Sequence, residues 1–335
     1  MKRNRTFVVA VIVIIFLLAA GAWWFGRIPE NSPPAREPIV IGTSPFEVSG
    51  LIFIAYDQGY FEENCLLPQI KMYDAGAIAM DALYRGDVDI ATAADTVFAW
   101  NSISGFPIQG VASIGKSEFH YIIARQDRGI RNISDLRGKK IGVARGTSGD
   151  FFLGRFLALQ RINLSDVEII DLPPAQLTEP LLNGSVDAVS TWDPYAFAIE
   201  ERLGNNAQVW PDQKGQMMYW IAICRKDYVL ENPLKIHNFL QALQQAEKYV
   251  ENHPDAAKLI VQKKLHTENT YMNRVWPFTQ LSLSLDQSLV LAMEDEARWM
   301  IANNLTNKTS VPDFREYLYI DGLEAVKPGS VNIIR

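Results

Sequence analysis

The residues most suited to binding chemistry lie in a Gly-Thr-Ser-Gly turn, Gly146 to Gly149, which follows a β-rich segment and precedes an apolar helix. Such a turn offers hydroxyl groups, free backbone N–H groups and the positive end of a helix, which together suit an anion. Arg145 can add a charge-assisted hydrogen bond. We therefore predict that Arg145, Thr147, Ser148 and Gly149 hold the anionic end of a ligand. The alternative is an ordinary helix N-cap.

Three further loops follow predicted strands, and ligands of open α/β sheets bind where strands end. The candidate residues in them are Ser44 and Phe46 in the first loop, Asp95 and Thr96 in the second, and Trp192 and Asp193 in the third. The two carboxylates would repel nitrate or bicarbonate and would pair with an amine. A taurine-like aminosulfonate or a cationic heterocycle is therefore predicted, with Trp192 over its apolar part. The alternative is that each Asp caps a helix and that Trp192 is packed in the core.

Signatures of catalysis are weak. The four histidines have no H-E-x-x-H spacing, and Gly146 to Gly149 is not a G-x-S-x-G elbow. Gly110 to Ser117 matches the phosphate-loop pattern, but Val111 to Ile114 has the composition of a strand, whereas that pattern needs a loop that opens a helix. We predict a protein that is not an enzyme and that binds no metal and no cofactor.

The composition excludes some partners and indicates export. A net charge of -6 argues against nucleic acid. Lys2, Arg3 and Arg5 precede an apolar run over residues 7–26, which predicts a periplasmic or extracytoplasmic protein. An A-x-A-like site at 20–22 favours a cleaved signal peptide, whereas the length of the run favours a membrane anchor; both remain open. Prolines between residues 26 and 38 predict an extended tether.

The only cysteines are Cys65 and Cys224. In an exported protein they could form a disulfide, or each could be a buried small hydrophobic residue. Spacing does not decide between the two. A lipoprotein is excluded, because neither cysteine follows the apolar run.

An internal repeat of about 100 residues organises the remaining chain. Three segments recur in order: Ile41-Gly42 as Ile141-Gly142, Leu83 to Asp89 as Leu181 to Asp187, and Ile122 to Arg125 as Ala222 to Arg225. Each unit alternates strands with helices that end at glycine, which predicts two similar α/β lobes with mainly parallel strands. After Arg225 the pattern is helical, with Pro233 and Pro254 as first-turn prolines.

The ordered motifs resemble a known family. They are Ile41-Gly42, Asp57 to Phe61, Ala82 to Ala91, Asp135 to Val143 and Thr191 to Tyr195. Together they are similar to the substrate-binding proteins of nitrate, sulfonate and taurine ABC transporters, a group that includes thiamine-precursor binders. Cys65 departs from the family, which often has glycine there.

The resemblance implies a two-lobed type II periplasmic-binding-protein fold, with a hinge of crossing strands and a C-terminal helical extension. We expect a leader and tether over residues 1–38, lobe I over 39–119 and 226–335, and lobe II over 120–225. The implied partners are a small-molecule ligand and an ABC transporter permease, with the membrane as a third partner if the leader is uncleaved. Alternatives on the same fold are a membrane-anchored ligand sensor and, with less support, an enzyme of thiamine-precursor synthesis.

Overall fold

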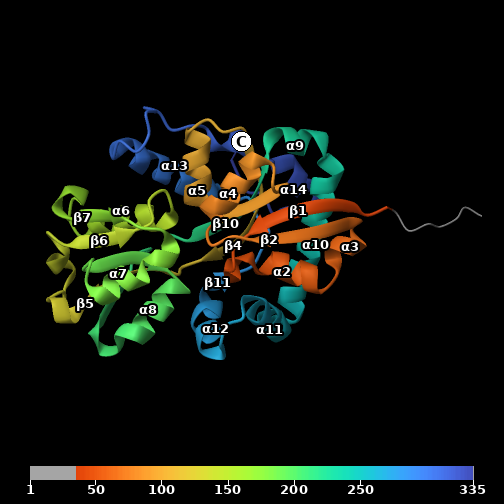
Figure 1. Ribbon diagram of the computed structural model, residues 1–335. Helices are drawn as coiled ribbons and strands as arrows, with labels where there is room; N and C mark the ends of the chain where they lie inside the picture. Colours follow the sequence, from red (N-terminus) through yellow and green to blue (C-terminus); the bar gives the residue numbers. More distant parts are fainter. Residues whose placement is uncertain (1–34, 335) are drawn as a thin grey trace, which may run out of the picture. The chain divides into compact units, whose positions relative to one another are not determined.

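The computed structural model describes residues 35–334, which form two α/β lobes, each built around one sheet (Figure 1). Two sequence predictions, the apolar run over residues 7–26 and most of the Pro-rich tether, lie outside the described residues. Within the described part of the chain, no helix is long and apolar enough to cross a membrane.

The sheet of the first lobe has the strand order β11-β4-β10-β3-β1-β2. Its strands are β1 (Glu37–Thr43), β2 (Leu66–Met72), β3 (Ile90–Ala94), β4 (Ile108–Ser117), β10 (Met218–Arg225) and β11 (Thr279–Gln280). Strands β2, β1 and β3 are parallel, whereas β10 is antiparallel to both β3 and β4. The phosphate-loop match Gly110 to Ser117 lies inside β4, so it is a strand as predicted and forms no phosphate loop.

The sheet of the second lobe repeats this plan in the order β7-β6-β8-β5-β9. Its strands are β5 (His120–Arg125), β6 (Lys140–Val143), β7 (Glu168–Asp171), β8 (Ala188–Trp192) and β9 (Ala207–Pro211). Here β7, β6 and β8 are parallel, and β5 runs antiparallel between β8 and β9. The parallel core predicted from the repeat is present in both lobes, but each sheet also has an antiparallel part.

The chain crosses between the lobes twice, at residues 118–119 and at residues 212–217. The predicted boundary at residue 225 differs from this, because β10 pairs with β3 and β4 in the first sheet. In its own sheet, β10 occupies the place that β5 occupies in the second sheet. The repeat of 122–125 at 222–225 therefore relates equivalent strands of two different lobes.

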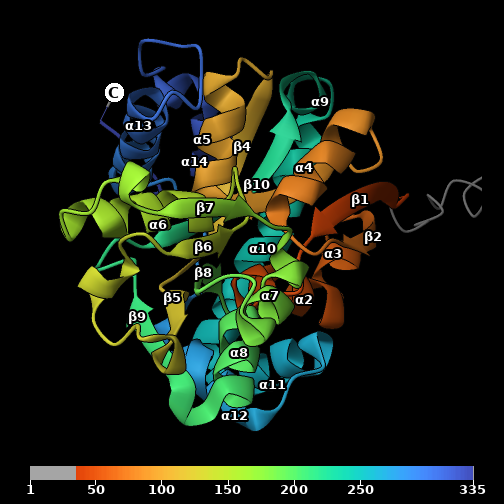
Figure 2. The same ribbon diagram turned by 60° about the vertical axis from the view of Figure 1, so that its left-hand side comes forward.

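Helices cover both sheets (Figures 1 and 2). Those of the first lobe are α2 (Gly50–Asp57), α3 (Tyr60–Glu63), α4 (Gly76–Arg85) and α5 (Asp95–Ile103), and those of the second are α6 (Ser148–Leu159), α7 (Thr178–Asn183) and α8 (Tyr195–Leu203). The C-terminal helices are α9 (Lys226–Glu231), α10 (Pro233–Asn252), α11 (Pro254–Leu265), α12 (Asn269–Val275), α13 (Gln287–Ala302) and α14 (Ile320–Val326). Short 3-10 helices are η1 (Glu47–Ser49), η2 (Gln126–Arg128), η3 (Ile133–Leu136), η4 (Leu164–Asp166), η5 (Pro174–Gln176), η6 (Gly204–Asn206), η7 (Trp276–Phe278) and η8 (Phe314–Tyr317).

Two expectations about helix ends are confirmed. Gly86 and Gly184 end α4 and α7 in the left-handed conformation, at φ 75° and 81°, which glycine adopts without a steric penalty. Pro233 and Pro254 lie in the first turns of α10 and α11. The C-terminal helices bury their apolar faces in the same core as the first sheet.

The two cysteines are free and do not form a disulfide. Cys224 is fully buried in β10, where burial raises the pKa of its thiol. Cys65 has a φ of 59°, in the left-handed region that favours glycine. This backbone conformation explains why a glycine suits the position.

Candidate functional site

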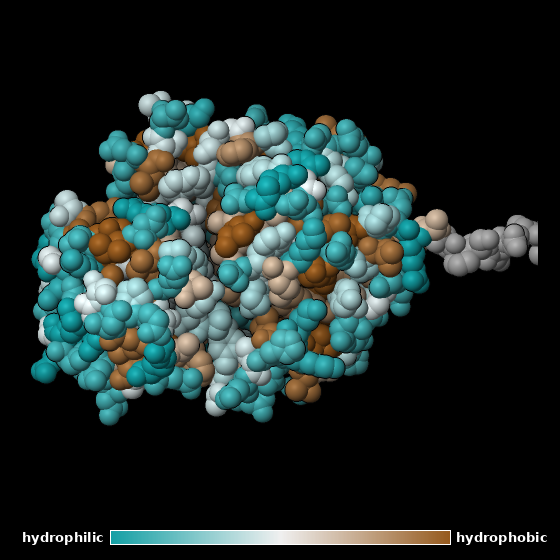
Figure 3. Space-filling model, in the orientation of Figure 1, coloured by the Kyte–Doolittle hydropathy of each residue, from teal (hydrophilic) through white to brown (hydrophobic). Residues whose placement is uncertain are grey.

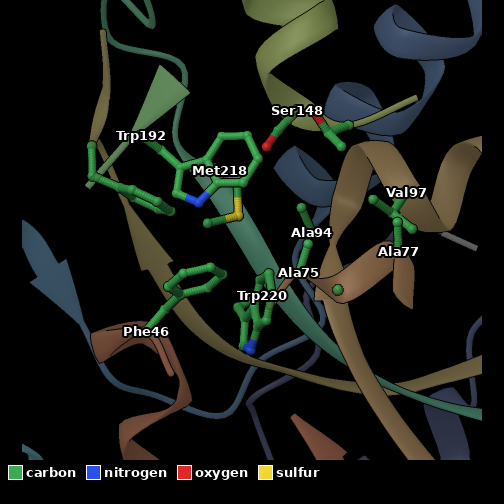
Figure 4. Close-up of a pocket in the computed structure, with 12 residues that line it drawn as sticks. Phe46, Ala75, Ala77, Ala94, Val97, Ser148, Trp192, Met218 and Trp220 are labelled. Carbon is green, nitrogen blue, oxygen red and sulfur yellow. The ribbon is translucent and has the colours of Figure 1, made fainter. Parts of the chain in front are cut away.

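A small pocket lies between the two lobes, at the carboxyl ends of their strands (Figure 4). Its cavity volume is about 20 Å³, which is room for about one water molecule. The first lobe contributes Phe46, Ala75, Gly76, Ala77, Ala94, Val97, Met218 and Trp220, and the second lobe with its crossing segment contributes Phe119, Thr147, Ser148 and Trp192. The lobes are thus closed on each other, and a larger ligand requires them to separate.

Two helices from opposite lobes begin at this pocket. Helix α4 follows Ala75 and helix α6 follows Thr147, and neither N-cap residue accepts a hydrogen bond from its helix through its side chain. The first N–H groups of a helix have no acceptor within it, and the helix dipole places partial positive charge there. Gly76 allows α4 to begin against β3, since a Cβ at this position would lie 2.6 Å from the Cα of Ala93. The pocket therefore has two positive helix ends, one from each lobe.

The hydroxyl groups of the α6 turn have separate partners. Thr147 Oγ1 donates to the backbone oxygen of Ala144 at 2.7 Å, so its side chain is not the N-cap that we considered as the alternative. Ser148 Oγ lies 2.9 Å from Nε2 of His120. A Cβ on Gly149 would contact the Trp192 ring at 3.4 Å, so the turn lies against that indole. Thr147 and Ser148 line the pocket, whereas Gly149 lies behind the Trp192 ring.

Aromatic side chains make up much of the remaining wall (Figure 4). Phe46 packs edge-on against Trp192 and Trp220, with ring centroids 6.4 and 5.8 Å apart. Figure 4 shows Met218 beside the Trp192 ring. The Nε1–H groups of both indoles are buried and have no hydrogen-bond partner among the described residues. Unpaired buried donors of this kind are costly, which makes them candidates to bind a ligand acceptor.

Asp95 and Thr96 lie beside the pocket but face the protein interior. Asp95 accepts hydrogen bonds from the backbone N–H groups of Thr96 and Tyr219, at 3.0 and 3.3 Å. Thr96 Oγ1 donates to Glu296 at 2.7 Å. Burial raises the pKa of both carboxyl groups, and the adjacent Asp95 raises that of Glu296 further. Asp95 therefore binds backbone N–H groups of α5 and β10 and stabilises the fold, and it is absent from the pocket lining.

Three other predicted residues also lie outside the lining. Arg145 pairs with Asp150 at 3.2 Å and is about one-third exposed. Ser44 is fully buried, and its backbone oxygen accepts a hydrogen bond from Ser49. Asp193 accepts from the backbone N–H of Phe197 at 3.1 Å, as a residue that caps α8 would do. Asp95 and Asp193 thus each accept a hydrogen bond from a backbone N–H in the first turn of α5 or α8.

The second carboxylate oxygen of Asp193 belongs to a charged contact between the lobes. Arg274 of α12 lies 3.2 Å from Asp193 and 2.6 Å from Glu200 of α8, and its guanidinium stacks 4.9 Å above the Tyr121 ring. We call Arg274, Asp193 and Glu200 the bridge. Burial raises the pKa of Asp193 to about 6, and Arg274 opposes that rise. The bridge joins a C-terminal helix of the first lobe to two residues of the second.

Glu47 lies next to this bridge and is fully buried. One carboxylate oxygen accepts a hydrogen bond from Tyr271 Oη at 3.0 Å, and the other has no partner among the described residues. Burial raises its pKa to about 7, and the nearby Asp193 contributes to the rise. Glu47 is therefore a titratable group near neutral pH at the contact between the lobes.

The sequence-based prediction missed several residues that line the pocket. The loop before α4 follows a strand end, so the same rule that selected the other loops could have found Ala75 and Gly76. Met218 and Trp220 alternate along β10 on one face of the sheet, a pattern that signals a buried strand face rather than a site. The histidine next to Ser148 has no local signal, since His120 and Ser148 are 28 residues apart.

The fold and site define a two-lobed periplasmic-binding-protein architecture. The chain matches the family model described as NMT1/THI5 like over residues 47–257, and it belongs to that family. A protein of Brucella abortus (strain 2308) named as a binding protein is 27% identical over 276 residues, 80% of each chain. A protein of Bacillus subtilis (strain 168) named as an aliphatic sulfonates-binding protein is 25% identical over 257 residues, 74% of this chain and 75% of the relative.

The fold also matches solved structures. The crystal structure of the periplasmic aliphatic sulphonate binding protein SsuA from Escherichia coli aligns with a TM-score of 0.70 at 19% identity, over 86% of this chain and 99% of that chain. The predicted fold class and the predicted family are both confirmed.

Proposed function

We propose that this protein is the extracytoplasmic solute-binding component of an ABC transporter and that it binds a small organic oxyanion. The observation that carries the proposal is the meeting of two helix N-termini, from α4 and α6, at one pocket between two lobes. Oriented N–H groups and helix dipoles stabilise negative charge without a cationic side chain. The names of the curated relatives, which include sulfonate binding, support the same class.

The proposed mechanism is lobe closure. An anion between α4 and α6 interacts with both positive helix ends only when the lobes are closed, so it stabilises the closed state by its differential affinity. The closed pocket of about 20 Å³ is too small for a sulfonate. Binding therefore proceeds through opening, entry and closure around the ligand, and a permease would recognise the closed form.

The lining favours an oxyanion with an apolar body. Phe46, Val97 and Met218 offer carbon surface, and no charged side chain lines the pocket among the described residues. Asp95 and Asp193 were the reason to expect an amine on the ligand, and both are engaged elsewhere. An alkanesulfonate therefore suits the site better than the aminosulfonate taurine. Nitrate and bicarbonate would leave the apolar wall without contacts.

A hydrolytic use of Ser148 and His120 is a weaker candidate. A serine nucleophile needs a basic histidine that is oriented by a third group. Nδ1 of His120 has no partner among residues 35–334, and burial lowers the pKa of this histidine to about 3. Such a histidine is a poor base, so the pair fits ligand binding rather than catalysis.

The relation to the membrane forms the second part of the proposal. Export through the apolar run over residues 7–26 would place the lobes outside the cytoplasm. A cleaved leader gives a diffusing binding protein, and a retained leader gives a tethered one that also suits a sensor. The mass of the mature protein, measured from its native compartment, distinguishes the two.

Native mass spectrometry of residues 36–335, followed by calorimetry, tests the proposed function. The panel contains ethanesulfonate, taurine, nitrate, bicarbonate and an aminopyrimidine. We expect ethanesulfonate to bind more tightly than taurine and nitrate. Tightest binding of the aminopyrimidine, or binding of none of the panel, contradicts the proposed ligand class.

A further inference from the structure

His120 and Ser148 form a buried pair at the wall of the pocket. Nε2 of His120 lies 2.9 Å from Ser148 Oγ, and the two residues are 2% and 7% exposed. The imidazole is packed among Phe119, Phe152 and Trp192, with ring centroids 5.0, 5.0 and 5.5 Å away. This apolar surrounding keeps the ring neutral, in agreement with its lowered pKa of about 3.

The surroundings also select one of the two neutral tautomers. Nδ1 of His120 is buried without a partner among the described residues. If Nδ1 carried the proton, a buried N–H donor would be left without an acceptor, which is costly. An unprotonated ring nitrogen without a partner costs less, because buried acceptors without partners are tolerated more often than buried donors without partners. The proton therefore belongs on Nε2, which donates to Ser148 Oγ.

This donation determines the role of the serine. Oγ accepts from His120, so the Ser148 O–H must point elsewhere, and Ser148 lines the pocket (Figure 4). We propose that His120 is a positioning residue that makes Ser148 a hydrogen-bond donor to the ligand, so that the site selects fully ionised oxyanions over isosteres that carry a proton. The selectivity part rests on the proposed function.

The other polar groups at the pocket agree with a site that only donates. The indole N–H groups of Trp192 and Trp220 are unpaired donors. The O–H of Thr147 is already used on Ala144. A ligand group that donates a hydrogen bond has no side-chain carboxylate to accept it in the described lining. Such a group would lose its hydrogen bond to water without replacement, which is the basis of strong rejection in polar sites.

His120 is held in place by the second crossing segment. Gln213 Oε1 accepts hydrogen bonds from the backbone N–H groups of Phe119 and His120, at 2.6 and 3.0 Å. Gln213 Nε2 in turn donates to the backbone oxygen of Ser117 at 3.0 Å. The histidine is thus anchored where the chain passes between the lobes, so its orientation is set by the fold and does not require a ligand.

The first test reads the tautomer in the free protein. Nitrogen NMR of wild type, labelled with ¹⁵N at histidine, distinguishes an Nε2–H from an Nδ1–H imidazole, and His120→Gln assigns the signal. We expect a neutral Nε2–H ring that does not titrate between about pH 5 and 8. An Nδ1–H ring or a titrating His120 overturns the positioning role without reference to any ligand.

The second test measures selectivity with two probes of similar size. At about pH 5, methanesulfonate is fully ionised, whereas methylphosphonate keeps one P–OH group. We expect wild type to prefer methanesulfonate by roughly tenfold or more, since one unmatched hydrogen bond costs about 1–3 kcal/mol. In His120→Phe, the Ser148 hydroxyl can turn and accept, so methylphosphonate should gain affinity and the ratio should fall. His120→Gln keeps a donor near the Nε2 position and should retain the ratio.

Serine variants provide the matched comparison. Ser148→Ala should weaken methanesulfonate binding by about tenfold, whereas Ser104→Ala, at an exposed serine of the first lobe, should not. A wild-type ratio in His120→Phe overturns the selectivity claim alone. If wild type binds neither probe, the selectivity claim falls together with the proposed ligand class.

Discussion

The lobes meet through two groups of side chains that differ in charge. The pocket is lined by aromatic and small apolar residues with neutral donors, and its helices supply only partial charges. The bridge instead joins Arg274 to Asp193 and Glu200, with Glu47 buried beside it. Neutral donors suit ligand recognition, because they bind an anion but do not form an ion pair with a protein carboxylate when no ligand is bound. Full charges suit the control of closure, because they attract across the gap with or without ligand.

This difference implies that specificity and closure can be altered separately. Changes in the pocket should alter which ligand binds. Changes in the bridge should alter how easily the lobes separate, and therefore the apparent affinity for every ligand alike.

The largest effect is expected for Trp192→Ala in the pocket. Trp192 is 4% exposed and packs against Phe46, so its removal should lower the free energy of unfolding by about 3–5 kcal/mol. Binding of ethanesulfonate should fall by roughly 30-fold or more, the scale of a central aromatic contact. Thermal unfolding and calorimetry measure the two effects. Trp210→Ala, on the edge strand β9, should lose stability but bind within about twofold of wild type; equal loss of binding in both contradicts a specific role for Trp192.

Glu47→Gln should stabilise the protein at high pH. The folded-state pKa of Glu47, about 7, exceeds its ordinary value of 4.5, so the folded protein holds an extra proton between these pH values. Stability from this group is therefore full below 4.5 and is lost as pH rises to about 7. At about 1.4 kcal/mol per pKa unit, the variant should gain about 3 kcal/mol over wild type at about pH 8 and nothing at about pH 4.5.

Denaturant titrations at both pH values measure this difference. Glu251→Gln, at an exposed position of α10, is the control for loss of a carboxylate away from the contact between the lobes. Each variant must be compared with wild type at the same pH, because His120 changes the stability with pH in the opposite direction to Glu47. Its lowered pKa means that stability from this histidine rises as pH increases from about 3 to its ordinary value of 6.5. A gain in Glu47→Gln that is equal at both pH values contradicts the prediction.

Arg274→Met should weaken the bridge without changing ligand ranking. It leaves Asp193 and Glu200 unpaired, and since the arginine is 24% exposed we expect a loss of about 1–3 kcal/mol, below the range for a fully buried pair. The lobes should open more readily, so association with ethanesulfonate should be faster in stopped-flow measurements. Arg202→Met removes an exposed pair with Glu179 and should change neither quantity. A changed order of affinities across the ligand panel would show that the bridge takes part in recognition.

The smallest effect is expected for Arg145→Gln. The sequence predicted that this arginine contacts the ligand, but it pairs with Asp150 and lies outside the lining. Affinity for ethanesulfonate should stay within about twofold of wild type, because the arginine does not line the pocket. A tenfold loss in calorimetry would show that Arg145 turns into the pocket when ligand binds.

The sequence by itself determined the two α/β units, their glycine-terminated helices and four of the pocket residues, because these depend on local patterns. Strand periodicity, helix caps and the rule that ligands bind at strand ends all act within a few residues, and they identified Phe46, Thr147, Ser148 and Trp192.

Only the tertiary structure decided how the candidate side chains are used. Asp193 meets Arg274 across 81 residues, and Ser148 meets His120 across 28, so no local pattern records either contact. The place of β10 in the first sheet likewise depends on a distant contact, because β10 pairs with β3, which lies more than 100 residues earlier in the chain. A carboxylate at a strand end can face a ligand, cap a helix or bind an arginine, and burial together with the available partners selects among these. Arg274, the charged partner of Asp193, comes from the other lobe, and the local sequence does not specify it.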